Sequence, residues 1–130
     1  MKMNRPIIGI TMGDPAGIGP EIVAKALALR EIYEICRPLV VGDAGVMKQG
    51  IQIAGVNLEV NPISQPSEAK FRFGSMDVLD LKNVNLSELQ HGRISPMAGK
   101  AAFQAIRKVI ELAMRGEIDA TVTAPIHKGA

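Results

Sequence analysis

Length, composition and charge describe an ordinary globular chain. It has 130 residues, of which 47% are hydrophobic and 22% are charged, enough for one α/β domain with a core of its own. The net charge of +2, without a basic cluster, gives no support for binding nucleic acid or a membrane surface. There is neither a bilayer-length apolar run nor a secretory signal, and the one cysteine, Cys36, cannot form an internal disulfide, so we expect a cytoplasmic protein.

The first stretch predicts a strand, a glycine-rich loop and a helix in series. Residues 7–11 are short, apolar and rich in isoleucine, which is typical of a buried strand. Residues 13–19 cannot continue that strand, because Pro15 lacks an amide donor and Gly17 and Gly19 accept unusual backbone angles. Pro20 then suits the first position of a helix, and the acidic residue that follows it suits the helix dipole.

Such a loop directs unpaired amide groups of the helix toward a space where an anion could bind. Its glycines follow the pattern G-x-x-x-G-x-G, which matches neither the dinucleotide fingerprint nor the P-loop. Asp14 would repel a phosphate unless it binds a metal, a ribose hydroxyl or the local backbone. From the pattern alone, a tight strand-to-helix turn without any ligand explains the loop equally well.

The middle of the chain predicts a parallel α/β arrangement with weaker elements after it. The first helix is expected to continue irregularly to residue 35, and residues 38–43 to form a second strand parallel to the first. Asp43 is expected to cap a helix over residues 46–53, which Gly55 ends. The remaining predictions are a weak strand at 57–60, a loop at 61–67, short strands at 70–73 and 76–81, and a connection at 83–90.

The clearest helix of the chain begins at Ser95 and Pro96, which suit the N-cap and the first helical position. We expect its buried stripe to consist of small and branched apolar residues, namely Ala102, Ala105, Ile106, Val109, Ile110 and Ala113. Gly116 is expected to end it, and residues 119–123 to form a buried strand. The predicted fold is therefore α/β, with a mostly parallel sheet and helices on both faces.

Ligands of open parallel sheets bind beyond the carboxyl ends of the strands, and two predicted loops leave strands at that edge. One covers residues 12–19. The other follows Thr123 and carries His127, which could bind a metal or transfer a proton, and Lys128, which could bind a phosphate or carboxylate. A lone histidine or lysine on a loop is more often simply solvated, so both are candidates. His91 is expected on the surface, and no metal site is predicted within the chain.

Three blocks of sequence resemble the 4-hydroxythreonine-4-phosphate dehydrogenase family of pyridoxine biosynthesis. They are GITMGDPAGIGPEI at residues 9–22, GRIS at 92–95 and TAPIHK at 123–128, and they occur in the family's order. The first block is the longest and most specific. A shorter related loop occurs in the isocitrate and isopropylmalate dehydrogenases, whose fold the family shares and whose loop lies beside NAD.

The resemblance implies NAD-dependent oxidation of 4-phosphohydroxy-L-threonine followed by loss of carbon dioxide, in a homodimer that builds its site from two subunits. It places Asp14, Gly17, Ile18 and Gly19 near the NAD. It also implies a divalent metal (Zn, Mg or Co), but the family's metal-binding histidines and its Gly-His-Thr substrate motif correspond to no residue of this chain. We therefore expect this chain to be the amino-terminal part of a two-domain enzyme, and inactive alone.

Two alternatives stay open. A related branch of the family oxidises threonate or erythronate 4-phosphate, and the residues present do not separate the two branches. A different class of function is a non-catalytic binding or interaction domain that retains the fold without the chemistry.

Overall fold

A parallel β-sheet organises residues 5–125, the part of the chain that this computed structural model describes. Its strands are β1 (Ile7–Thr11), β2 (Arg37–Gly42), β3 (Glu59–Ile63), β4 (Ser75–Asp80) and β5 (Ala120–Thr123). Their order is β3-β4-β2-β1-β5, and every neighbouring pair is parallel. All five carboxyl ends therefore meet at one edge, as the sequence predicts.

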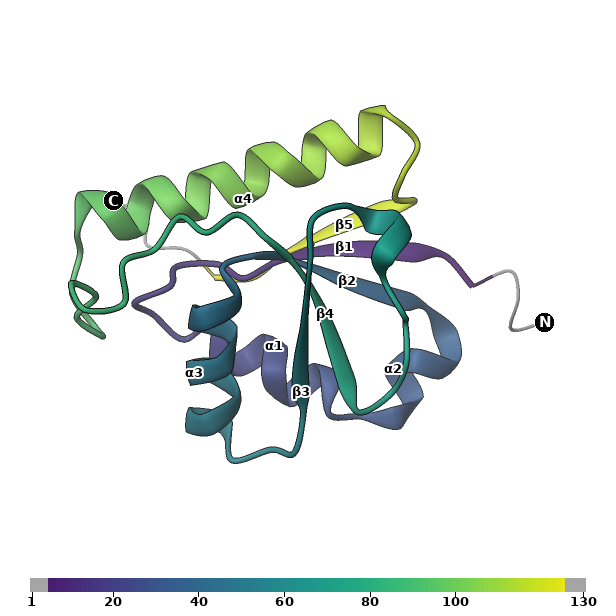
Figure 1. The fold of residues 1–130 in the computed structure, drawn as a ribbon, viewed down its shortest axis with the longest axis horizontal. Coiled ribbons are helices and arrows are strands. Elements are labelled where there is room, and N and C mark those ends of the chain that lie inside the picture. The colour runs from purple at the N-terminus through teal and green to yellow at the C-terminus, as the bar shows by residue number, and fades with distance from the viewer. Residues whose placement is uncertain (1–4, 126–130) are drawn as a thin grey trace.

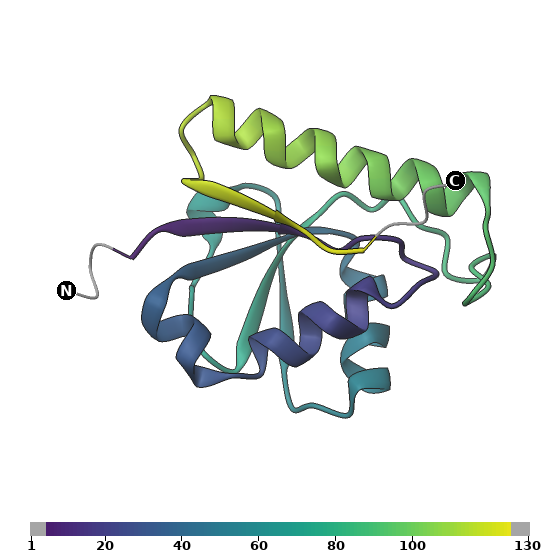
Figure 2. The ribbon, with the colours of Figure 1, turned by 180° about the vertical axis from the view of Figure 1, so that it is seen from behind.

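Helices cover both faces of this sheet, which confirms the predicted architecture. In Figure 1, α1 (Gly19–Leu27), α2 (Arg30–Ile35) and α3 (Ala44–Ala54) lie below the sheet, and α4 (Pro96–Met114) lies above it. Figure 2 shows the same two layers from behind. A short 3-10 turn, η2 (Pro66–Glu68), follows β3. Within residues 5–125, none of the helices combines the length and apolarity needed to cross a bilayer.

The central strand β2 shows how the core is divided between the two layers. Side chains alternate along a strand, so Leu39 and Val41 pack with α4, whereas Val40 packs with α1 and α3. All three are fully buried. The continuous apolar run of β2 is thus explained by burial on both faces, which is the usual situation for an inner parallel strand.

Helix ends follow the predicted signals closely. The Asp43 side chain accepts a hydrogen bond from the Val46 amide at the start of α3, and Gly55 ends that helix in the left-handed conformation, with φ of 69°. The Ser95 hydroxyl accepts from the Ala98 amide at the start of α4. These local bonds confirm the predicted caps, because each satisfies a backbone group that the helix itself leaves unpaired.

The buried face of α4 differs from the predicted stripe. The residues that face the sheet are Ala98, Ala101, Ala102, Ala105, Val109 and Leu112. Ile106 is half-buried, whereas Ile110 is 52% exposed and Ala113 is also exposed, so placing Ile110 and Ala113 in the core was wrong. Leu112 was overlooked. Apolar residues occupy more than one side of this helix, and the narrow side rich in alanine is the one that fits close to the sheet.

Two predicted segments in the middle of the chain are also corrected. Residues 70–73 form a loop instead of a strand, because the amides of Lys70 and Phe71 donate to the buried carboxylate of Asp77 instead of to another strand. Residues 61–63, expected in a loop, belong to β3. Pro62 is tolerated because β3 lies at the edge of the sheet, where one side of the strand needs no partner.

The predicted burial of the last strand was wrong. All four residues of β5 are exposed, Val122 to 52% of its surface. The strand pairs with β1 and forms the other edge of the sheet within residues 5–125. Apolar, β-branched composition indicated a strand correctly, but it does not reveal how many neighbours the strand has.

The corrected face of α4 gives a stability prediction. Leu112→Ala should lower the free energy of unfolding by about 2–5 kcal/mol, because this 1%-exposed side chain fills the space between α4 and the sheet. The matched change Ile110→Ala, two residues earlier on the same helix, should cost about 0.5 kcal/mol or less because the side chain is half in solvent. Urea unfolding followed by circular dichroism measures both, and equal losses would contradict the assigned face.

Candidate functional site

The loop that follows β1 is built from a buried half and an exposed half. Met12 and Asp14 are buried, whereas Gly17 and Ile18 are exposed, Ile18 to 61% of its surface. The chain then enters α1 directly, with Pro20 in its first turn and no side chain capping its first amides. The exposed half of the loop therefore presents backbone and one apolar side chain at the carboxyl edge of the sheet.

Hydrogen bonds bring three separate loops together at this edge. The Asp14 amide donates to the carbonyl oxygen of Pro125, 3.0 Å away, and the Ala124 amide donates to the Thr11 hydroxyl oxygen at 3.2 Å. The Gly92 amide donates to the carbonyl oxygen of Ala16 at 2.7 Å. The sequence predicts that the first two loops leave the sheet at the same edge, but not that their strands are neighbours, and it gives no signal for the contact of the Gly92 loop.

Two glycines of this region are required by the protein's own backbone. Gly13 has a φ of 77°, and a Cβ added there would lie 2.4 Å from the Pro125 carbonyl oxygen. A Cβ added at Gly19 would lie 2.4 Å from the Met12 carbonyl oxygen. The missing side chain at Gly19 is therefore explained by local packing, whether or not a ligand approaches it.

Gly17 is a different case. A Cβ added there would meet nothing closer than Asp14 Cβ, at the ordinary contact distance of 3.4 Å, and its φ lies outside the left-handed region. The fold thus tolerates a side chain at this position. If Gly17 must be a glycine, the reason lies outside the described residues.

The sequence left three partners open for Asp14, namely a metal, a ribose hydroxyl and the local backbone. In the structure its side chain bonds to the local backbone. Its Oδ1 atom accepts a hydrogen bond from the Ala16 amide at 2.8 Å, and the Gly17 amide donates to the Asp14 carbonyl oxygen at 3.0 Å. The first bond forms an Asx turn and the second a β-turn, and together they stiffen the loop. One oxygen of the buried carboxylate therefore bonds to the loop itself.

The remaining predicted residues are not brought into this site by the described structure. His127 and Lys128 lie outside the described residues. His91 is exposed, as expected, beside Gly92. Among residues 5–125, no three histidine, cysteine, aspartate or glutamate side chains are close enough together to hold a metal ion.

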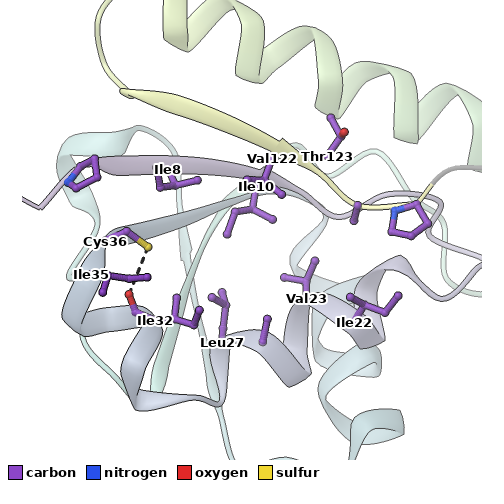
Figure 3. Close-up of a pocket in the computed structure, with 14 residues that line it drawn as sticks. Ile8, Ile10, Ile22, Val23, Leu27, Ile32, Ile35, Cys36, Val122 and Thr123 are labelled. Carbon is purple, nitrogen blue, oxygen red and sulfur yellow. Dashed lines mark hydrogen bonds between the residues drawn. The ribbon is translucent and has the colours of Figure 1, made fainter.

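An apolar groove of about 550 Å³ adjoins the site and was missed by the sequence analysis. It lies between β1, β5, α1 and α2, and Figure 3 shows Ile8, Ile10, Ile22 and Val122 around it. The groove runs along β5 as far as Pro125. Isoleucines at alternate positions of β1 were a signal for it, but they were read as core because sequence does not show that β5 is exposed.

Cys36 lies in the wall of this groove, where it fills space as expected. Its thiol donates to the Ile32 carbonyl oxygen at 3.4 Å (Figure 3). Burial raises the pKa of the Cys36 thiol, and the nearby Arg5 opposes this only in part. A raised thiol pKa disfavours the reactive thiolate, which agrees with a structural role.

Comparisons with known proteins point in one direction. The family model described as "Pyridoxal phosphate biosynthetic protein PdxA" matches residues 34–130. The chain is similar to proteins named "Putative D-threonate 4-phosphate dehydrogenase" from Clostridium botulinum and Symbiobacterium thermophilum, at 50% identity over 128 residues and 52% over 127. Each alignment covers 98% of this chain and 38% of the relative.

A solved structure has the same fold over the same portion. It is a 4-hydroxythreonine-4-phosphate dehydrogenase from Burkholderia phymatum, which matches with a TM-score of 0.93 at 45% identity. The match covers 96% of this chain and 38% of that one. This chain thus spans well under half the length of the relatives that it matches.

The contrast between the two loop glycines can be tested on the 130-residue chain. Gly19→Ala should lower the free energy of unfolding by about 1–3 kcal/mol or more, because the new Cβ collides with the Met12 carbonyl oxygen. Gly17→Ala should leave it unchanged or raise it by about 0.4–1 kcal/mol, because the position has room and the unfolded chain loses freedom. Denaturant midpoints that are equal for the two variants would contradict the packing described for Gly19.

Proposed function

The chain belongs to the family of the pyridoxal phosphate biosynthetic protein PdxA, and on this basis we propose that it forms the cofactor-proximal part of an NAD-dependent dehydrogenase of a phosphorylated four-carbon hydroxy acid. The observation that carries the proposal is the convergence of the three family blocks at one edge of the sheet. Hydrogen bonds join the loop after β1 to the Gly92 loop and to the exit from β5.

D-threonate 4-phosphate is the substrate that we propose first. The sequence-based expectation placed 4-phosphohydroxy-L-threonine first and threonate 4-phosphate second. The curated relatives reverse that order, since those at 50% and 52% identity carry the threonate name. The second candidate remains 4-phosphohydroxy-L-threonine, because the similar solved structure from Burkholderia phymatum is a dehydrogenase of that compound.

The two substrates share the reaction and differ at one carbon. In both, a hydride leaves carbon 3 for NAD and the hydroxyl proton leaves to a base, which gives a ketone beside the carbon that bears the carboxylate. That product loses carbon dioxide readily. Carbon 2 carries a hydroxyl in threonate and an ammonium group in hydroxythreonine, so discrimination requires a polar group placed at carbon 2. His127 and Lys128 remain candidates for proton transfer and for binding phosphate or carboxylate.

The described residues suit the binding of NAD through the loop after β1. The uncapped first turn of α1 offers amide donors to an anionic group, and exposed Ile18 offers an apolar contact to a ribose or base. Gly17 lets the ligand approach the backbone, while Asp14 and Gly19 hold the loop in shape. When bound, NAD supplies the hydride acceptor. We assign no metal ligand to residues 5–125, and the homodimer and the cytoplasmic location stay predictions.

Substrate preference can be tested with an enzyme of family length that contains this sequence. With NAD and a divalent metal, kcat/KM should be higher for D-threonate 4-phosphate than for 4-phosphohydroxy-L-threonine, as measured by NADH absorbance. The 130-residue chain, assayed in parallel, should produce no NADH. A preference for hydroxythreonine phosphate would favour the second candidate, and turnover of neither compound would support a non-catalytic domain.

The role of the loop after β1 is tested with Ile18→Ala in the same enzyme. If Ile18 packs on the cofactor, losing part of that apolar contact should raise KM for NAD about fivefold and change KM for the substrate little. Leu29→Ala is the matched control, because Leu29 is similarly exposed but follows the far end of α1. An unaltered KM for NAD in Ile18→Ala would leave the loop as a tight turn without a cofactor role.

A further inference from the structure

The strand β1 lies inside the sheet, yet its two faces are covered unequally. It pairs with β2 on one side and with β5 on the other. Gly9 and Thr11, on the face that packs against α4, are buried, whereas Ile8 and Ile10 on the opposite face are only half-buried. Inner strands of parallel sheets normally have helices on both faces. The face of β1 that carries the two isoleucines therefore lacks part of its cover within residues 5–125.

The apolar groove of about 550 Å³ is the space left open on this face. Its lining includes the two isoleucines of β1, Val122 of β5, and the exposed side chains Ile22 of α1 and Ile35 of α2 (Figure 3). None of the described residues that line it is charged. Contact between water and so much apolar surface is unfavourable, and such a patch usually marks a contact with another polypeptide segment.

The two edge strands of the described sheet differ in a way that supports this interpretation. The edge strand β3 contains Glu59 and Pro62, a charged residue and one without an amide donor, and both discourage pairing with a further strand. The edge strand β5 reads Ala-Thr-Val-Thr and contains neither kind of residue. Small and β-branched residues without charge are typical of a strand that has neighbours on both sides. β5 thus has the composition of an inner strand.

The relatives contain enough additional chain to cover both the groove and this edge. The alignments cover 38% of the curated relatives and 38% of the solved structure from Burkholderia phymatum. More than half of each relative therefore lies outside the portion that corresponds to this chain. The walls of the groove are two helices packed on a sheet, so one further helix would complete the same layer.

We propose that, in a protein of family length, a helix from outside these 130 residues lies in the groove and a strand pairs with the free edge of β5. The helix presents apolar side chains to Ile10, Ile22 and Val122. The groove is thus an internal surface of the longer protein, and the occupant belongs to the same chain. This inference goes beyond the proposed function and does not depend on the reaction.

The handedness of the fold limits which part of the longer chain supplies the helix. The helix α4 connects β4 to β5, crosses the sheet outward and lies on the face opposite the groove (Figures 1 and 2). One more parallel step outward from β5 would place its connecting helix on the α4 face as well, because such connections are right-handed. The helix in the groove is therefore not a direct connection from β5 to a parallel neighbour, and it comes from a different part of the longer chain.

Thiol labelling tests whether the groove is covered. Val122→Cys places a thiol in the groove, and Leu29→Cys is the matched control, because Leu29 is 51% exposed against 52% for Val122 and does not line the groove. In the 130-residue chain, a maleimide should modify both sites at similar rates. In the protein of family length, Val122→Cys should react at least about tenfold more slowly, and Leu29→Cys should react as before. Mass spectrometry of the peptides follows each site separately.

Two outcomes of the labelling would overturn the proposal. One is an equal rate for Val122→Cys in the two proteins, which would show that the groove stays open in the longer chain. The other is slow labelling of Val122→Cys already in the 130-residue chain, which would assign the groove to a second copy.

Photo-crosslinking identifies the occupant. With p-benzoylphenylalanine in place of the exposed Ile35, irradiation of the protein of family length should join position 35 to a segment of the same chain outside these 130 residues. The product should keep the mass of one chain on a denaturing gel. A product of twice that mass, or no product at all, would overturn the proposal. A joined segment that runs directly from β5 to a parallel neighbouring strand would overturn its topological part.

Neither measurement requires turnover. A protein of family length that oxidises neither substrate but shows the expected labelling and cross-link would refute the proposed function and confirm the covered groove. An active enzyme in which Val122→Cys labels as fast as in the 130-residue chain would do the reverse.

Discussion

The close approach of two backbone segments, the loop after β1 and the exit from β5, is the constraint on which the candidate site depends. The Pro125 carbonyl oxygen accepts from the Asp14 amide and lies 2.4 Å from where a Cβ of Gly13 would be, so a side chain at Gly13 would displace the bonded segment. The Met12 carbonyl oxygen excludes a Cβ at Gly19 in the same way. Parallel pairing of β5 with β1 brings the two segments to the same edge, and the absence of side chains lets them touch.

Sequence reasoning succeeded wherever the deciding interaction is local. Asp43 and Ser95 were recognised as caps because the amides that they bind lie three residues away. It failed where a distant partner decides. Residues 70–73 alternate like a strand, but the amides of Lys70 and Phe71 donate to the buried Asp77 carboxylate, so the segment forms a loop. No pattern near residue 70 indicates this bonding. The exposure of β5 was missed for a related reason, since a strand at the edge and one at the centre can have the same composition.

The candidate site shows the same division. That the loops after β1 and β5 leave the sheet at the same edge follows from the parallel direction of the strands, which was predicted. That β5 pairs directly with β1 was not predicted. The approach of Gly92 to Ala16 was not predicted either, because the segment between β4 and α4 has no periodic pattern from which its path could be inferred. The resemblance to a family indicated that the blocks belong together in function, but only the structure shows that amides of one block bond to carbonyls of another.

The glycine-rich block after β1 therefore contains residues with different physical reasons for their identity. Gly13 and Gly19 must be glycines because a Cβ at either position would collide with backbone inside the protein. The identity of Asp14 is explained by the turn in which its side chain bonds to the Ala16 amide. Gly17 and Ile18 are exposed, and a side chain at Gly17 would make only ordinary contacts with the described residues. A motif is often treated as one binding element, but here the ligand-facing part is confined to two neighbouring positions. The remainder of the motif builds the rigid support that places those two positions at the start of α1.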